Sequence, residues 1–109
     1  MVALRAASGF GVWRADTDDQ VVVAVVGELD MGTAPKVWEV LAQAFEHDGL
    51  IAIDLSGVTF MDSQGLKLFV RAHKRATRDG GRLVLRSPQP QARRVFEVTA
   101  LDRVFAIED

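Results

Sequence analysis

No cysteine occurs among the 109 residues, and no run of about 18 apolar residues is present. The lack of cysteine excludes a disulfide framework, a thiolate metal site and a cysteine nucleophile. The lack of a long apolar run predicts that no segment spans a membrane. The formal net charge is only −2, so overall composition argues against nucleic acid as a direct partner. Arg5 interrupts the N-terminal apolar residues, which therefore do not resemble a signal peptide, and a cytoplasmic protein is expected.

A single domain is the organisation that length and composition favour. Hydrophobic residues make up 49% of the chain and charged residues 26%, which are ordinary shares for a soluble globular protein. A chain of this length can bury a sufficient core without disulfides or a structural metal. The domain is expected to cover residues 1–109, with residues 1–9 as a loose N-terminal extension.

Strand-like and helix-like segments alternate along the chain. Residues 21–26 are almost all β-branched and are expected to form a strand buried on both faces, followed by a polar loop at residues 28–30. Residues 57–61 are expected to form a loop before a helix that begins at about Ser63. The predicted strands are residues 10–14, 21–26, 50–55, 82–86 and 104–107, and the predicted helices begin near residues 33, 63 and 90.

This alternation predicts a single α/β domain with a mixed central sheet of four to five strands and about three packed helices. The first two strands are close enough for an antiparallel hairpin, and the later ones are expected to pair in parallel through right-handed crossovers. The pattern leaves open whether the helices cover one face of the sheet or both. Buried helix faces are expected at Val37, Val40, Leu41, Ala44 and Phe45, at Leu66, Phe69, Val70 and Ala76, and at Ala92, Val95, Phe96 and Thr99.

The pair Asp62-Ser63 opens the second predicted helix and admits two interpretations. One is an N-cap, because Asp and Ser both accept hydrogen bonds from first-turn amides. The other is reversible phosphorylation of Ser63, because the positive end of a helix accommodates an anion and a phosphate adds about −1.5 to −2 charge. Both can hold at once, with Asp62 as the cap and Ser63 exposed. Gly65 is expected to leave the neighbouring surface bare, so that another protein can approach the hydroxyl.

Other side chains near this pair suggest further chemistry. The carboxylates of Glu28, Asp30, Asp54 and Asp62 would cluster if their strands are neighbours, as an acid–base pair or as a solvated rim. A nucleophilic serine is disfavoured, because Met61 stands where the nucleophile elbow requires glycine. No cofactor or metal motif is present in the sequence. Basic residues recur at helical spacing along the second predicted helix, at Lys67, Arg71, Lys74, Arg75 and Arg78. We interpret this basic stripe as a solvated face, or else as a docking surface for an acidic partner. Apolar residues of the expected loop would form an interaction patch if exposed, and these are Val58, Phe60 and Met61.

Several of these segments together resemble the STAS-domain anti-sigma factor antagonists. The most specific is Met-Asp-Ser-x-Gly-Leu at residues 61–66, and the resemblance extends from about Val21 onward. The supporting segments are residues 27–30, 54–56, 80–83, Ser87-Pro88, 94–96 and Leu101. The sequence departs from the family pattern at Gln64 and at Ala100, and the family's usual C-terminal helix is expected to be missing or shortened.

The resemblance implies a regulatory protein that is not an enzyme and that needs no cofactor. Its implied partners are an anti-sigma factor serine kinase, which binds and phosphorylates the antagonist, and a PPM-type phosphatase, which reverses the modification. The unphosphorylated form would occupy the kinase and release the sigma factor, with the protein itself a monomer or weak dimer. The implied phosphorylation site is Ser63, and the residues expected to contact a partner are Asp30, Phe60, Met61, Asp62, Gln64 and Gly65.

Two alternatives remain open at this point. One is a STAS binding or scaffold subunit of a stress-signalling assembly or of a lipid-transport complex, which would bind partners without turnover at Ser63. The other is a small hydrolase that uses the clustered carboxylates and would require a deep polar pocket at Ser63 and Asp30. A docking protein would instead present a flat or convex surface there.

Overall fold

The computed structural model describes residues 2–5 and 9–109, which form six strands and three α-helices. The strands lie side by side in the order of the chain, from β1 to β6. Their bounds are β1 Val2–Arg5, β2 Gly11–Asp16, β3 Gln20–Leu29, β4 Leu50–Met61, β5 Leu83–Arg86 and β6 Ala106–Glu108. The helices are α1 Ala34–Ala44, α2 Ser63–Arg78 and α3 Pro90–Val98, and a single 3-10 turn, η1, covers Leu101–Arg103.

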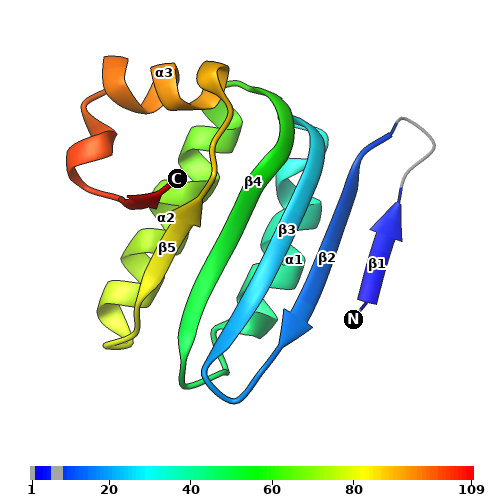
Figure 1. Cartoon of the computed structure of the whole chain (residues 1–109), viewed down its shortest axis with the longest axis vertical. Coiled ribbons are helices and arrows are strands. Elements are labelled where there is room, and N and C mark those ends of the chain that lie inside the picture. The colour runs from blue at the N-terminus through cyan, green and yellow to red at the C-terminus, as the bar shows by residue number, and fades with distance from the viewer. Residues whose placement is uncertain (1, 6–8) are drawn as a thin grey trace.

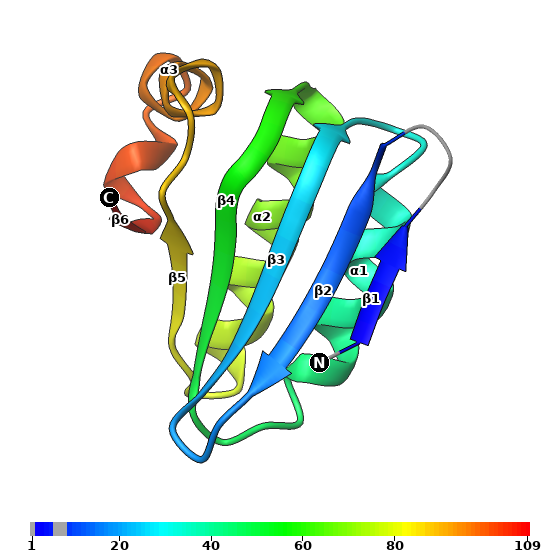
Figure 2. The ribbon, with the colours of Figure 1, turned by 45° about the vertical axis from the view of Figure 1, so that its right-hand side comes forward.

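The sheet is mixed, which confirms the predicted α/β class. β1, β2 and β3 pair antiparallel, including the expected hairpin of β2 and β3, whereas β3, β4, β5 and β6 pair in parallel. Since the parallel strands follow one another in one direction, crossovers of the same hand bring their helices to the same face. Figures 1 and 2 show α1 and α2 side by side behind the sheet.

The N-terminal residues contribute a strand that the sequence did not indicate. β1 pairs with β2 along the edge of the sheet, from Val2 opposite Arg14 to Arg5 opposite Gly11. It lies within the segment expected as a loose extension, of which residues 1 and 6–8 are outside the described part. None of the described helices has the length and apolar character needed to cross a bilayer.

The prediction that β3 is buried on both faces is wrong. Val21, Val23 and Val25 are fully buried, whereas Val22 and Val26, which alternate with them, are only half-buried. Successive side chains of a strand point to opposite faces, and helices cover only one face of this sheet. The β-branched run therefore reflects a strand that is buried on one side and partly open on the other.

Two segments that were expected to be loops also belong to strands. β3 continues through Glu28 to Leu29, and β4 continues from the predicted end at residue 55 through to Met61. The two extensions pair with each other, with Glu28 opposite Phe60 and Leu29 opposite Met61, after register shifts in the ladder. Polar and glycine residues indicated a loop there, but they occupy irregular strand positions instead.

The predicted starts of the first two helices are close to those observed. α1 begins after Thr33 with Pro35 in its first turn, and α2 ends at Arg78 and is followed by Gly80, whose φ of +73° suits a left-handed cap. The buried face of α2 is partly different from the prediction. Phe69 and Ala76 are buried as expected, but Leu66 and Val70 are only half-buried, and Leu68 and Ala72, which were not among the predicted residues, are buried.

The C-terminal part packs on the edge of the sheet beyond β5 (Figure 1). Phe96 of α3 is fully buried and contacts Phe69 of α2 and Phe105, with ring centroids 6.1 Å and 5.6 Å apart. Ala92 is buried as predicted, whereas Thr99 is exposed as the C-cap residue of α3. The aromatic contacts attach α3 to α2 and so join this edge to the main core.

Candidate functional site

The N-terminus of α2 lies at the edge of the sheet where β3 and β4 both end. Leu29 and Met61 are the last residues of these strands and face each other in the ladder. The amide of Asp62 then donates a hydrogen bond to the Leu29 carbonyl at 3.2 Å, which carries the pairing one residue further. The first turn of α2 is thereby placed against β3 before the helix begins.

Asp62 caps α2, as one of the two interpretations predicted. Its Oδ1 accepts hydrogen bonds from the amides of Gln64 at 2.8 Å and Gly65 at 3.4 Å. Ser63 is the first helical residue and is exposed, and in the described part of the chain its hydroxyl has no hydrogen-bond partner. The arrangement therefore leaves the hydroxyl accessible while the adjacent carboxylate satisfies the helix end.

Two residues expected to contact a partner point into the core instead. Met61 is 1% exposed and Gly65 is buried. A Cβ on Gly65 would lie 2.6 Å from Met61 Cγ and 3.1 Å from the Leu29 carbonyl oxygen. Gly65 is thus required for the close approach of α2 to β3, and it does not leave an exposed bare surface beside Ser63.

The apolar residues around Ser63 are divided between core and surface. Val58 is buried, whereas Phe60 is 43% exposed at the end of β4. Met31, in the turn between β3 and α1, is 75% exposed and was not identified from the sequence. An isolated methionine in a polar turn gives no periodic signal, so its exposure depends on how the turn leaves the sheet. Of the expected contact residues, Phe60 is exposed and Asp30, Asp62 and Gln64 are half-buried.

Asp30 organises the turn between β3 and α1. Its Oδ1 accepts hydrogen bonds from the amides of Gly32 at 2.9 Å and Thr33 at 3.1 Å. The Thr33 hydroxyl donates to the Glu28 carbonyl at 2.7 Å, which fixes the same turn from the other side. The side chain of Asp30 is therefore engaged in local structure, and it is half-buried.

Of the four carboxylates considered as a possible cluster, Asp54 lies apart from the others, whereas Glu28 and Asp30 line one hollow. Asp54 lies within β4, opposite Ala24 and Arg86, and its Oδ1 accepts the Ser56 amide at 2.9 Å. Over residues 2–5 and 9–109, no group of three or more histidine or carboxylate side chains could hold a metal ion. Asp30 lines one hollow of the surface and Gln64 another, but Ser63 lines neither of the two. Neither of these two hollows is the deep polar pocket shared by Ser63 and Asp30 that a hydrolase would require.

The hollow that contains Gln64 lies between α1 and α2. Its lining combines apolar side chains with the cations of the second helix, and consists of Met31, Ala34, Pro35, Trp38, Gln64, Lys67, Leu68 and Arg71. The Arg71 guanidinium lies 3.8 Å from the centre of the Trp38 ring, and that of Arg75 lies 5.2 Å from the Phe45 ring. Two arginines of the basic stripe therefore contact aromatic residues in α1 and at its C-cap, while Lys67 and Lys74 are exposed.

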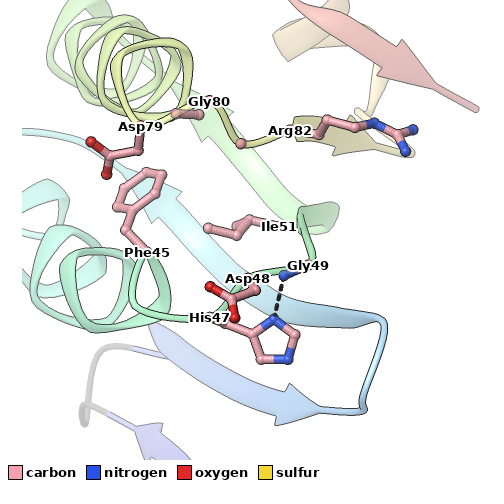
Figure 3. Close-up of a pocket in the computed structure, with 10 residues that line it drawn as sticks. Phe45, His47, Asp48, Gly49, Ile51, Asp79, Gly80 and Arg82 are labelled. Atoms are coloured by element: carbon pink, nitrogen blue, oxygen red, sulfur yellow. Dashed lines mark hydrogen bonds between the residues drawn. The ribbon is translucent and has the colours of Figure 1, made fainter.

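A third hollow lies at the opposite end of the sheet and contains His47 (Figure 3). The Gly49 amide donates to His47 Nδ1 at 2.9 Å, so the hydrogen of the ring lies on Nε2. Nε2 in turn donates to the Thr17 carbonyl at 2.8 Å, which joins the α1–β4 loop to the β2–β3 turn. His47 is thus used to connect two loops, and it lies at the other end of β4 from Ser63.

The free energy of unfolding at low pH is expected to depend on Asp79. The pKa of this carboxyl lies below its usual value because the Arg75 guanidinium donates a hydrogen bond to it at 2.9 Å. A lowered pKa stabilises the folded state fully above the ordinary value of 3.8, and this contribution is lost as pH falls through the lowered pKa. Asp79→Asn should therefore show a smaller loss of stability than wild type between about pH 4 and pH 2 in urea denaturation. Parallel pH profiles for the two proteins would contradict this.

The N-cap should contribute measurably to stability. Asp62→Ala removes the acceptor of two first-turn amides and is expected to lower the free energy of unfolding by about 1 kcal/mol. Asp62→Asn keeps an oxygen acceptor and is the matched control, with an expected loss well below that of Asp62→Ala. Urea denaturation at neutral pH measures both, and equal losses would contradict the role of the oxygen acceptor.

The sequence matches a known family over most of its length. Residues 13–109 match the family model described as the STAS domain. The chain is 38% identical over 92 residues to the anti-sigma-B factor antagonist of Listeria monocytogenes, covering 84% of this chain and 81% of that one. It is 32% identical over 90 residues to the anti-sigma-B factor antagonist of Bacillus subtilis, covering 83% of each chain.

Solved structures show the same architecture. An anti-sigma factor antagonist from Mycobacterium paratuberculosis superposes with a TM-score of 0.83 at 30% identity, covering 96% of this chain and 90% of that one. The Bacillus cell fate determinant SpoIIAA, in its phosphorylated form, gives a TM-score of 0.69 at 25% identity, covering 88% and 89%. SpoIIAA has therefore been solved with a phosphate attached to this type of fold.

Proposed function

Since the chain belongs to the STAS domain family, we propose that it is an anti-sigma factor antagonist that binds an anti-sigma factor serine kinase and is released by phosphorylation at Ser63. In this proposal the kinase binds ATP and catalyses the transfer, and the Ser63 hydroxyl of this chain accepts the phosphate. A PPM-type phosphatase would restore the binding form. The curated relatives carry the name of antagonists of anti-sigma-B factor, and this name supports the same class of partner here.

The position of Ser63 is the observation that carries the proposal. The hydroxyl is exposed at the first position of α2 and is not engaged by another described residue. Transfer of a phosphoryl group requires that a kinase active site surround the acceptor oxygen, which burial of the serine would prevent. Asp62 holds the helix end independently, so Ser63 can be modified without loss of the cap.

Charge explains how the modification would end the complex. A kinase that docks Ser63 must place the hydroxyl next to the terminal phosphate of ATP, where negative charge is already concentrated. A phosphate on Ser63 adds about two more negative charges beside Asp62. The helix N-terminus accommodates this charge in the free protein, but a surface built to approach a neutral hydroxyl does not.

A retention experiment on lysate tests the proposal. Immobilised wild-type protein is expected to retain a serine kinase from the cytoplasm of its own cells, whereas Ser63→Asp retains far less of it. Incubation of wild type with the retained kinase and ATP should add the mass of one phosphate, and Ser63→Ala should add none. Equal retention by wild type and Ser63→Asp, with no phosphate added to wild type, would favour the scaffold alternative and contradict the phosphorylation switch.

A further inference from the structure

The C-terminal half of β4 has an edge that β5 does not cover. β5 pairs only with residues 51–54 of β4, whereas β4 continues to Met61. On its other side β4 remains paired with β3 as far as Met61. The backbone groups of the buried Met61 that face away from β3 therefore need partners from another element, since buried amides and carbonyls are costly to leave unpaired.

Two glutamine side chains of the α3 segment occupy this edge. Gln91 Oε1 accepts a hydrogen bond from the Met61 amide at 2.8 Å, and Gln91 Nε2 donates to the Met61 carbonyl at 3.0 Å. Gln89 Nε2 donates to the Ser56 carbonyl at 2.6 Å. The side-chain amide of Gln91 thus makes the same pair of bonds that a neighbouring strand would make to Met61.

We propose that Gln91 is a positioning residue for the phosphorylation of Ser63, an inference that rests on the proposed function. Met61 lies between two attachments, namely Gln91 on one side and the β3 partner Leu29 on the other. Asp62 and Ser63 follow directly, so the direction in which the chain leaves Met61 determines where the hydroxyl points. Displacement of an acceptor by about 1 Å can lower a transfer rate on the order of 100-fold.

The consequence is that α3 controls the reactivity of a site on another element. Gln91 is on α3, which packs against α2 through Phe96 and Phe69. Its contact with Met61 connects residues that are 30 positions apart in the sequence. A change that moves α3 would therefore alter Ser63 without any contact to the hydroxyl.

Amide hydrogen exchange tests the positioning directly and needs no kinase. In Gln91→Ala, the amide of Met61 and the first-turn amides of α2 at Gln64 and Gly65 are expected to exchange about tenfold faster than in wild type. Gln89→Ala is the matched control, because it removes a hydrogen bond of the same kind from the same segment at Ser56. The control should leave exchange at Met61, Gln64 and Gly65 within twofold of wild type.

Kinetics with the kinase retained by wild type supply the second readout. Gln91→Ala is expected to lower the kcat of Ser63 phosphorylation about tenfold with KM changed less than twofold, because the docking surface remains while the acceptor is displaced. Gln91→Glu keeps an acceptor for the Met61 amide but places a second oxygen against the Met61 carbonyl, and it should lower kcat at neutral pH as well. This variant replaces Gln91→Ala if the alanine protein does not fold. Gln89→Ala should retain the wild-type kcat even if its melting temperature falls.

The two readouts separate failure of this inference from failure of the proposed function. Unchanged exchange at Gln64 and Gly65 in both Gln91 variants overturns the inference, as does an unchanged kcat. If the retained kinase adds no phosphate to wild type, the proposed function fails. The exchange measurement then decides alone whether Gln91 holds the Ser63 segment.

Discussion

Replacement of Ser63 with aspartate is expected to weaken binding to the proposed anti-sigma factor kinase on the order of 100-fold, whereas Ser63→Ala should bind within a few-fold of wild type. The reason is that a fixed negative charge at this position meets the anionic end of the bound nucleotide, and like charges brought together at an interface cost several kcal/mol. Alanine removes only an exposed hydroxyl that has no partner within the described chain. Titration of each variant against purified kinase in the presence of a non-hydrolysable nucleotide measures the effect.

A charge control excludes a nonspecific explanation. Gln43→Glu adds one negative charge at an exposed position near the end of α1, away from the first turn of α2, and should bind the kinase as wild type does. Ser63→Asp should also melt within a few degrees of wild type, because an acidic residue in the first turn of a helix is favourable. Wild-type affinity of Ser63→Asp would contradict the electrostatic explanation, and equal weakening by Gln43→Glu would show that the effect is not local.

The local features of the site could be read from the sequence because they depend on neighbouring residues. An aspartate before a helical periodicity is a cap wherever the helix lies, and this was sufficient to place Asp62 and an accessible Ser63 correctly. The hairpin of β2 and β3 and the parallel order of the later strands follow from segment spacing in the same way. Motif and order together were enough to indicate the family.

The features that were mispredicted depend on contacts distant in the sequence. The burial of Val22 depends on which face the helices cover, which no property of residues 21–26 determines. The extension of β4 to Met61 depends on pairing with the end of β3 and on Gln91 from α3. A glutamine near the start of a helix has no distinctive pattern, so its bonds to Met61 could not be expected before the fold was known.

Gly65 was also mispredicted for this reason. Its small size allows α2 to pack closely against β3 and does not expose the surface beside Ser63. Gly65→Ala gains up to about 1 kcal/mol of helix propensity, but overpacking of a close contact costs about 1–3 kcal/mol. The added Cβ would meet Met61 Cγ at 2.6 Å, Leu29 Cγ at 3.0 Å and the Leu29 carbonyl oxygen at 3.1 Å. Leu29 and Met61 are both buried and are the paired ends of β3 and β4, so neither can move away easily. We expect the steric cost to exceed the gain.

The expected result is a lower melting temperature for Gly65→Ala, by up to about 16 °C, since a net loss of about 2 kcal/mol at about 4–8 °C per kcal/mol corresponds to about 8–16 °C in a domain of this size. The start of α2 should also move away from Leu29, which would lower the rate of Ser63 phosphorylation. Gly81→Ala is the matched control, because the nearest atom to its added Cβ is the Ala76 carbonyl oxygen at 3.7 Å, and it should melt close to wild type. A melting temperature of Gly65→Ala equal to that of Gly81→Ala would mean that α2 can shift without cost, and the close approach of helix and strand would then not be what places Ser63.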